Sequence, residues 1–285
     1  MSCFEFHRFS LALKCQFLST RRSWLRSFGI YSLVMFALSM FYCFFVFSNL
    51  DVIMEDNPSD AEKFDSYESF LETVVFPLMY AFIFIFMLIG ASSLFSLMKE
   101  TGSRTSYLML SVSRLEKYVV CLLHSIFLTG VIAMLSFVVA DVLRVLADLV
   151  TGRVIVWGTP LFFKSFFDGK DAPWQIVVFS YLVSIYVHSL YILGGSLFHR
   201  NQFLFTSIAY IIESFLVVGI CKNVPSLNYV YELLRADETG FTEVQPMLYV
   251  VGGIILCLIV LHYWLSYRIF CRMQAVNHKW LNINI

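Results

Sequence analysis

Six stretches of this chain are long and apolar enough to cross a membrane as helices. They run approximately over residues 28–48, 73–98, 118–140, 176–198, 203–221 and 247–267. A spanning helix needs roughly 20 mostly apolar residues, because the hydrocarbon core holds no water to bond with the backbone. Only 14% of the 285 residues are charged, against about 25% in soluble domains. The sequence predicts an all-α polytopic membrane protein with one transmembrane domain over residues 1–285, and it excludes a soluble globular enzyme.

Basic residues predict the orientation of the spans. Arg8, Lys14, Arg21, Arg22 and Arg26 precede the first span, and 8 of the other 15 Lys and Arg residues fall on the same side of the membrane. Because cytoplasmic segments are enriched in Lys and Arg, we expect both termini in the cytoplasm. Aromatic side chains accompany these charges over residues 1–27, which predicts a separate helix at the cytoplasmic interface. The alternative is an extension packed on the helix bundle.

The loop between the second and third spans holds the most informative local pattern. Ser113 is a residue that caps helices, and Glu116, three positions later, completes a capping box. This pattern predicts a short helix parallel to the membrane before the third span. It also indicates a contact surface, although a plain solvated connector remains an alternative on these residues.

One acidic residue falls inside a predicted span. Glu213 lies about ten residues into the fifth span, and His188 lies at a similar depth in the fourth, so we expect the two side chains at one level. A carboxylate in hydrocarbon costs roughly 2.5–3.5 kcal/mol, so Glu213 should face the bundle interior or water. Two interpretations stay open: a polar lining of a substrate path or proton relay, and an interhelical hydrogen bond.

Proline and glycine predict local features of the spans. Pro77 predicts a kink near the start of the second span. The pairs Gly194–Gly195 and Gly252–Gly253 predict close helix approach. After the third span, the sequence predicts an external helix in which Arg144 and Asp148 alternate with apolar residues.

Motifs for catalysis and metal binding are missing from the sequence. It contains no Walker A motif, no G-x-S-x-G, no H-E-x-x-H, and no Cys or His spacing typical of zinc or haem. We therefore expect no catalytic, cofactor-binding or metal-ligating residue and no enzyme activity. A formal net charge of zero gives no reason to expect nucleic acid as a partner.

Residues 110–118 read Leu-Ser-Val-Ser-Arg-Leu-Glu-Lys-Tyr. This run resembles the L-P-A-S-x-x-E-K-F/Y segment of ABC-2 type ABC transporter permeases, particularly Bacteroidetes-like ones. Ser111 stands where that family favours proline, and Val112 stands where it favours alanine. Residues 263–270 also resemble the family's end, where the last span runs into a basic cytoplasmic tail.

The resemblance implies the permease subunit of an exporter in the bacterial inner membrane. In the family, this loop holds a coupling helix that docks on a separate ABC ATP-binding subunit. The matching contact residues here are Ser113, Arg114, Glu116 and Lys117. A second permease subunit, identical or different, would complete the path in the lipid bilayer, and ATP would bind to the partner subunit alone.

Two other function classes fit the residues. One is a non-transporting membrane protein, such as a scaffold, an assembly factor or an immunity protein. The other is an ion-coupled carrier that uses Glu213 and His188.

Overall fold

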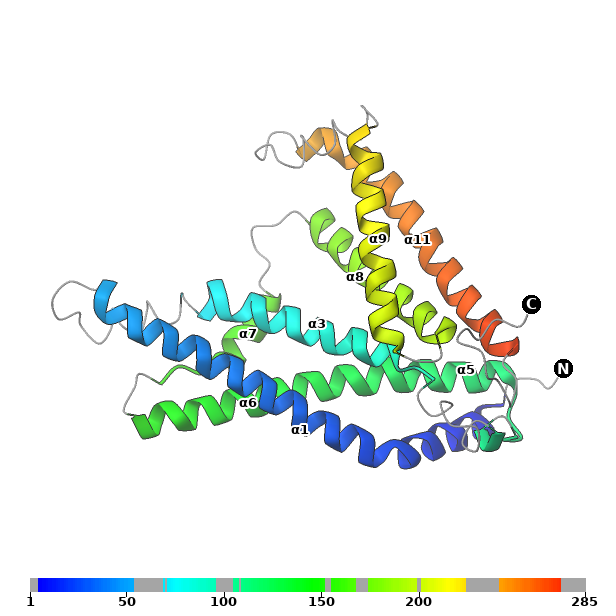
Figure 1. The fold of residues 1–285 in the computed structure, drawn as a ribbon, viewed down its shortest axis with the longest axis horizontal. Helices are drawn as coiled ribbons and strands as arrows, with labels where there is room; N and C mark the ends of the chain where they lie inside the picture. The colour runs from blue at the N-terminus through cyan, green and yellow to red at the C-terminus, as the bar shows by residue number, and fades with distance from the viewer. Residues whose placement is uncertain are drawn as a thin grey trace. The chain divides into compact units, whose positions relative to one another are not determined.

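The structure, a computed structural model, is almost entirely helical in the part of the chain that it describes and shows no strand there (Figure 1). The described residues are 5–53, 69, 71–95, 105–107, 109–151, 155–167, 174–198, 201–223 and 241–272. The helices are α1 (Phe6–Ile53), the π-helical η1 (Leu71–Val75), α3 (Phe76–Ser92), α5 (Arg114–Leu123), the π-helical η3 (His124–Leu128), α6 (Thr129–Thr151), α7 (Gly158–Phe167), α8 (Trp174–Leu197), α9 (Gln202–Asn223) and α11 (Phe241–Arg272). The expected all-α fold is confirmed for these residues.

Five helical stretches among the described residues are long and apolar enough to cross a membrane, so the chain has transmembrane character. They are Phe6–Phe41, Leu71–Ser92, Arg114–Thr151, Trp174–Leu197 and Tyr249–Arg272. The span expected at residues 203–221 forms α9, but its apolar stretch, Gln202–Val217, is shorter than the other five. The six expected spans therefore correspond to five candidate spans and one shorter apolar helix.

The helix expected at the N-terminal interface is not separate from the first span. α1 runs without interruption from Phe6 to Ile53, through the boundary expected near residue 28. These 48 residues contain no proline and only one glycine, Gly29. A single glycine costs a helix about 1 kcal/mol relative to alanine, so nothing in the sequence stops the helix there.

The irregularity expected at Pro77 is a π-helical turn. Pro77 is the second residue of α3, and α3 directly follows the π-helical residues Leu71–Val75. Proline has no N–H to donate to the carbonyl four residues earlier, so a regular α-helix would lose one hydrogen bond at this point. The change of helical register falls where that bond would be missing.

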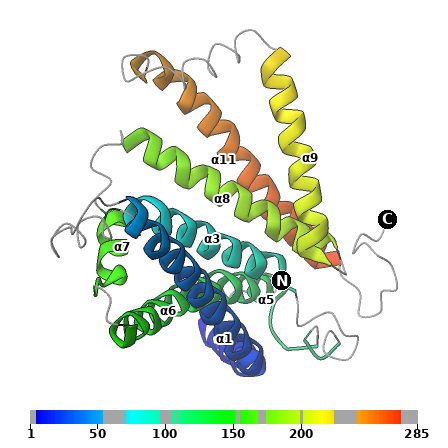
Figure 2. The ribbon, with the colours of Figure 1, turned by 60° about the vertical axis from the view of Figure 1, so that its left-hand side comes forward.

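Two compact units make up the fold, and each combines segments that are distant in the sequence. The first unit contains the start of α1 together with α5, α8, α9 and α11, and α8 contacts both α9 and α11 (Figures 1 and 2). A Cβ atom on Gly194 would lie 1.9 Å from Thr206 Oγ1 in α9, and one on Gly195 would lie 2.6 Å from the Ser92 carbonyl oxygen. The close approach expected at Gly194–Gly195 is therefore confirmed.

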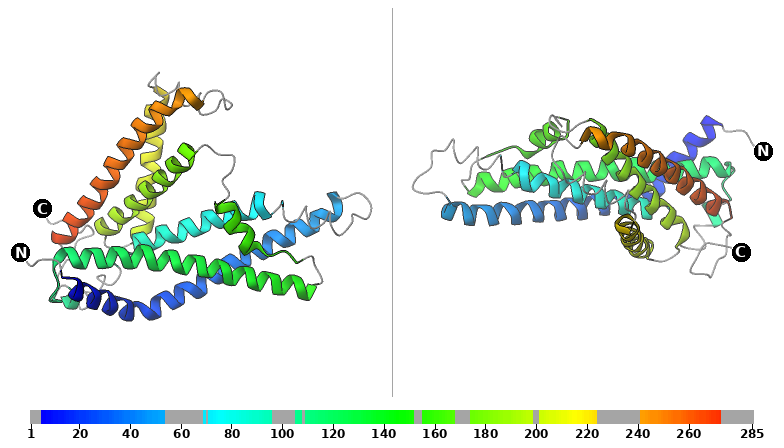
Figure 3. Two further views of the ribbon diagram at one scale, coloured as in Figure 1. Left: turned by 180° about the vertical axis from the view of Figure 1, so that it is seen from behind. Right: turned by 90° about the horizontal axis from the view of Figure 1, so that it is seen from above.

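The second unit contains the rest of α1, most of α3, and α6 and α7 (Figure 3). The Phe162 ring of α7 is fully buried in this unit. Its centroid lies 4.2 Å from the Tyr80 ring of α3 and 4.3 Å from the Phe137 ring of α6. The Tyr80 hydroxyl also donates to the Phe162 carbonyl oxygen at 2.9 Å. The short helix α7 is thus held against α3 and α6.

Candidate functional site

Ser113 caps the helix that begins at Arg114. Its hydroxyl accepts a hydrogen bond from the Glu116 amide at 3.2 Å, and the Glu116 carboxylate accepts one from the Ser113 amide at 2.8 Å. The expected capping box is confirmed. The helix itself differs from the expectation, because α5 continues through η3 and α6 to Thr151. Among the described residues of this loop, the box begins a candidate span, and a single helical turn at residues 105–107 precedes it.

The Glu116 carboxylate serves a second helix as well. Its Oε1 accepts a hydrogen bond from the Glu5 amide at 2.7 Å, directly before the first residue of α1. A negative charge stabilises a helix N-terminus, where backbone N–H groups have no partner within the helix. One fully buried carboxylate therefore holds the starts of α1 and α5 together.

Arg114 connects the same segment to the end of α11. Its Nη1 donates to the Cys271 carbonyl oxygen at 3.0 Å, one residue before α11 ends. The side chains of Arg114 and Leu115 are exposed, whereas Glu116 and Lys117 are buried. Of the four residues expected at a partner contact, Arg114 is exposed, Ser113 is half-buried, and the other two lie within the unit.

Glu213 of α9 contacts α8, but through a residue that the sequence did not indicate. The Tyr186 hydroxyl donates to Glu213 Oε1. The Tyr186 ring in turn lies against the His262 ring of α11, with centroids 5.4 Å apart. His262 Nδ1 forms a 3.0 Å hydrogen bond with the Ser189 hydroxyl, which returns the chain of contacts to α8. We call Tyr186, Ser189, Glu213 and His262 the three-helix cluster.

His188 is not part of the three-helix cluster. It is buried in α8, and its Nε2 has no hydrogen-bond partner among the described residues. No hydrogen bond joins it to Glu213. His188 and Tyr186 are two positions apart, so they point to nearly opposite sides of the helix. The similar positions of the two residues along their expected spans did not bring the pair together.

A second polar group lies in α6 and was expected outside the membrane. Asp141, Arg144 and Asp148 are buried, with 5%, 2% and 0% of their surface exposed. The opposite face carries exposed apolar side chains, including Leu149 at 59% and Val150 at 83%. This arrangement, polar inside and apolar outside, is the one that a lipid-facing helix requires. The exposed apolar surface of the helix therefore continues well beyond residue 140.

The Arg144 guanidinium bonds both carboxylates at once. It donates to Asp141 Oδ1 from Nη2 at 2.7 Å and from Nε at 3.1 Å, and to Asp148 Oδ2 from Nη1 at 3.0 Å. Nη2 also donates to the Val156 carbonyl oxygen at 2.6 Å. Charged pairs in a low-dielectric interior are stable only when their remaining hydrogen-bonding groups are also satisfied. Arg144 meets this condition with four hydrogen bonds.

Asp141 extends the same network to α7. Its Oδ2 accepts hydrogen bonds of 2.7 Å from both the amide and the hydroxyl of Thr159, in the first turn of α7. Gly158 makes this approach possible, since a Cβ atom there would lie 2.8 Å from Asp141 Oδ1. The carboxylate therefore caps α7 from a distant helix, as an anion at a helix N-terminus does.

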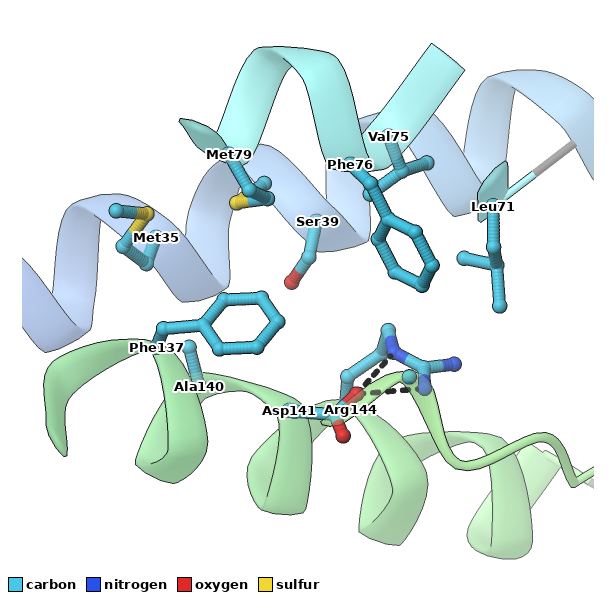
Figure 4. Close-up of a pocket in the computed structure, with 11 residues that line it drawn as sticks. Met35, Ser39, Leu71, Val75, Phe76, Met79, Phe137, Ala140, Asp141 and Arg144 are labelled. Carbon is cyan, nitrogen blue, oxygen red and sulfur yellow. Dashed lines mark hydrogen bonds and ion pairs between the residues drawn. The ribbon is translucent and has the colours of Figure 1, made fainter. Parts of the chain in front are cut away.

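A small cavity lies beside this network (Figure 4). Its volume is about 20 Å³, and Asp141 and Arg144 lie at one side of otherwise mainly apolar walls that include Phe76, Met79 and Phe137. A cavity of this size accommodates one water molecule and no larger ligand. The α6 network therefore has the features of a structural clip that holds α7, and not those of a substrate site.

The spacing of the α6 network was visible in the sequence. Positions 141, 144 and 148 share one helical face, and the apolar residues 142, 146 and 149 share the other. A polar helix face that meets water and one that is buried in a bundle give the same sequence pattern. The pattern therefore did not show that these charged residues are buried.

Among the described residues, no group of three His, Cys, Asp or Glu side chains is placed to hold a metal ion.

Comparisons of the chain with protein-family models, curated proteins and solved structures find no match.

Proposed function

We propose that this chain is the membrane-spanning permease subunit of an ABC-type exporter. A separate ATP-binding subunit supplies the energy, and a second permease subunit, identical or different, completes the translocation path. The proposal places the protein in the bacterial inner membrane with both termini in the cytoplasm. Labelling from outside the cell of a cysteine introduced at Ser103 or Asn277, which both lie beyond the described residues, would contradict this orientation.

The observation that carries the proposal is the junction at the capping box. Residues 110–118 resemble the permease segment that contacts the ATPase, and here they begin a candidate span. Glu116 ties this segment to the start of α1, and Arg114 ties it to the last turn of α11. A force applied to Arg114 or Leu115 would therefore act on three long helices together. This is the mechanical property that coupling to an ATPase needs.

Exposed residues of the junction provide the test. We expect an ATP-binding subunit, recognised by its nucleotide-binding motifs, to copurify with the wild type from its native membrane. Leu115→Glu and Arg114→Glu should lower its recovery at least tenfold, because both side chains are exposed at the start of α5. Lys164→Glu is the matched control, since Lys164 is an exposed basic residue of α7, in the other unit. Undiminished recovery in both junction variants, or no ATPase with the wild type, would overturn the proposal.

The three-helix cluster favours a second candidate, an ion-coupled carrier. Carboxylates within the spans of transporters serve as proton-binding groups, and here Glu213 bonds Tyr186, whose ring lies against His262. The two candidates differ in their energy source. Transport by the chain alone in liposomes, driven by a pH gradient and abolished in Glu213→Gln, would favour the carrier over the permease.

A further inference from the structure

A groove runs between α8 and α11 in the first unit. It encloses about 290 Å³ and is lined by apolar and aromatic residues, among them Trp174, Phe179, Leu182, Tyr249, Gly253 and Leu256. The volume is close to the lower end of the range of small-molecule sites in proteins, roughly 300–1,000 Å³.

Glycines account for the width of the groove. A Cβ atom on Gly253 would meet no atom within 4 Å, and one on Gly252 would first meet Leu182 Cδ2 at 3.5 Å. The close approach expected at Gly252–Gly253 is therefore not found. These residues leave space between the two helices instead of bringing them together.

The same helix seam leads to the three-helix cluster. Leu182 lines the groove, and Tyr186 follows it by four residues, so both side chains lie on one face of α8. Beyond Tyr186, the hydrogen bond between Ser189 and His262 again joins α8 to α11. From Trp174 to Tyr186 the helix rises about 18 Å. The groove, with Trp174 at one end, and Tyr186, which bonds the Glu213 carboxylate, therefore lie along one face of α8.

The carboxylate at this end has unused binding capacity. Glu213 is half-buried and accepts one hydrogen bond, from Tyr186, and within the described residues it forms no ion pair. α8 contains no Lys or Arg. An unpaired carboxylate in hydrocarbon is unfavourable, so a cation beside it would be stabilised. The Tyr186 ring adds a surface that attracts cations.

We propose that the groove and the three-helix cluster together bind a cationic amphiphile. The alkyl chain lies between α8 and α11, and the ammonium group lies at the Glu213 carboxylate beside Tyr186. This inference names a substrate class for the permease proposed above. Only the assignment of the bound amphiphile as a transported substrate rests on that function. Binding itself needs neither ATP nor a partner subunit.

Trp174 offers a local probe of this site, since it lines the groove at the end away from Tyr186. The other four tryptophans, at positions 24, 157, 264 and 280, are replaced by Phe, and the full chain is reconstituted in phosphatidylcholine vesicles. Dodecylamine with bromine on its last carbon is then added, because bromine quenches the fluorescence of a nearby indole. If the ammonium group is at Glu213, the bromine lies near Trp174.

We expect saturable quenching by the bromoamine, with half-saturation at a concentration at least tenfold lower than for the bromoalcohol of the same length. Glu213→Gln retains an acceptor for Tyr186 and removes the charge, so it should abolish the tenfold difference. Gly253→Leu fills the groove and should abolish saturable quenching by both compounds. Gly29→Leu is the matched control, because a Cβ atom on Gly29 in α1 also meets nothing within 4 Å.

Equal or unsaturable quenching by amine and alcohol in the wild type would overturn the inference. An amine preference that persists in Glu213→Gln would overturn it as well. Saturable amine binding in a chain that recovers no ATPase would support this site and refute the permease assignment, so the two failures are distinguishable.

Discussion

Replacing Arg144 with Met should destabilise the protein by about 3–5 kcal/mol, the usual loss when one partner of a buried ion pair is removed. Arg144 bonds the carboxylates of Asp141 and Asp148, and all three side chains are at least 95% buried. Met fills a similar length of the site, so the change removes charge and hydrogen bonds and leaves little new empty space. The lost stability therefore measures the cost of burying two carboxylates without their cation.

A compensated variant separates charge from packing. Arg144→Met combined with Asp141→Asn and Asp148→Leu removes all three charges. Because buried ion pairs are often replaced by uncharged groups at little cost, we expect this triple variant to recover most of the stability lost in the single one. Asn at position 141 still offers an oxygen to Thr159, which should keep α7 in place.

Unfolding in mixed micelles, titrated with SDS and followed by fluorescence, measures these differences. Arg22→Met is the matched control, since Arg22 is exposed and its substitution should change stability by no more than about 0.5 kcal/mol. A loss below about 1 kcal/mol for Arg144→Met would refute this account of the network. So would a triple variant that is no more stable than the single one.

Three further changes, with Gly29→Ala as a control, test local contacts of the fold. Gly158→Ala places a Cβ atom 2.8 Å from Asp141 Oδ1 and should cost about 1–3 kcal/mol in the same unfolding assay. Gly194→Ala should cost at least as much, because its Cβ atom would lie 1.9 Å from Thr206 Oγ1, whereas Gly29→Ala should be neutral or stabilising. Glu116→Gln leaves one side-chain oxygen for the amides of Glu5 and Ser113, so hydrogen exchange of at least one of these amides should accelerate.

Local signals in the sequence predicted local structure correctly. The capping box depends on two residues three positions apart, and Ser113 and Glu116 form it as expected. The length of the helix that this box begins was not determined locally. Whether the capped helix ends after two turns or continues to Thr151 depends on the next 35 residues, and these contain no proline or other stop signal.

To predict which face of a helix is buried, one must know whether water, lipid or protein surrounds that helix. The pattern of α6 separates a polar face from an apolar face, but it does not say whether the apolar face meets lipid or the protein. With water assumed outside residue 140, Arg144 and Asp148 were expected on the surface. In the structure both are buried and Leu149 is exposed, because the outer surface of this helix is apolar.

Contacts between helices depend on more than depth. Glu213 and His188 were expected together because they lie a similar number of residues into adjacent spans. The side chain that meets Glu213 is Tyr186, two positions away and on the other side of α8. Which side of α8 faces Glu213 depends on how α8 packs on α9. The close contact of Gly194 with Thr206, two turns further along α8, determines that packing. No pattern within α8 alone carries this information.

The α6 network and the three-helix cluster differ in how many hydrogen bonds and ion pairs their charged groups already form. This difference distinguishes a structural role from a binding role. In the α6 network, Arg144 forms four hydrogen bonds and Asp141 accepts from both Arg144 and Thr159, and the three charged side chains are buried. A cation added there would compete with Arg144 for the two carboxylates. Glu213 accepts one hydrogen bond and remains half-buried, at the end of a seam that also holds an open groove. A ligand cation at Glu213 would add an interaction and remove none, so this carboxylate, and not the more heavily charged network, is where binding is favoured.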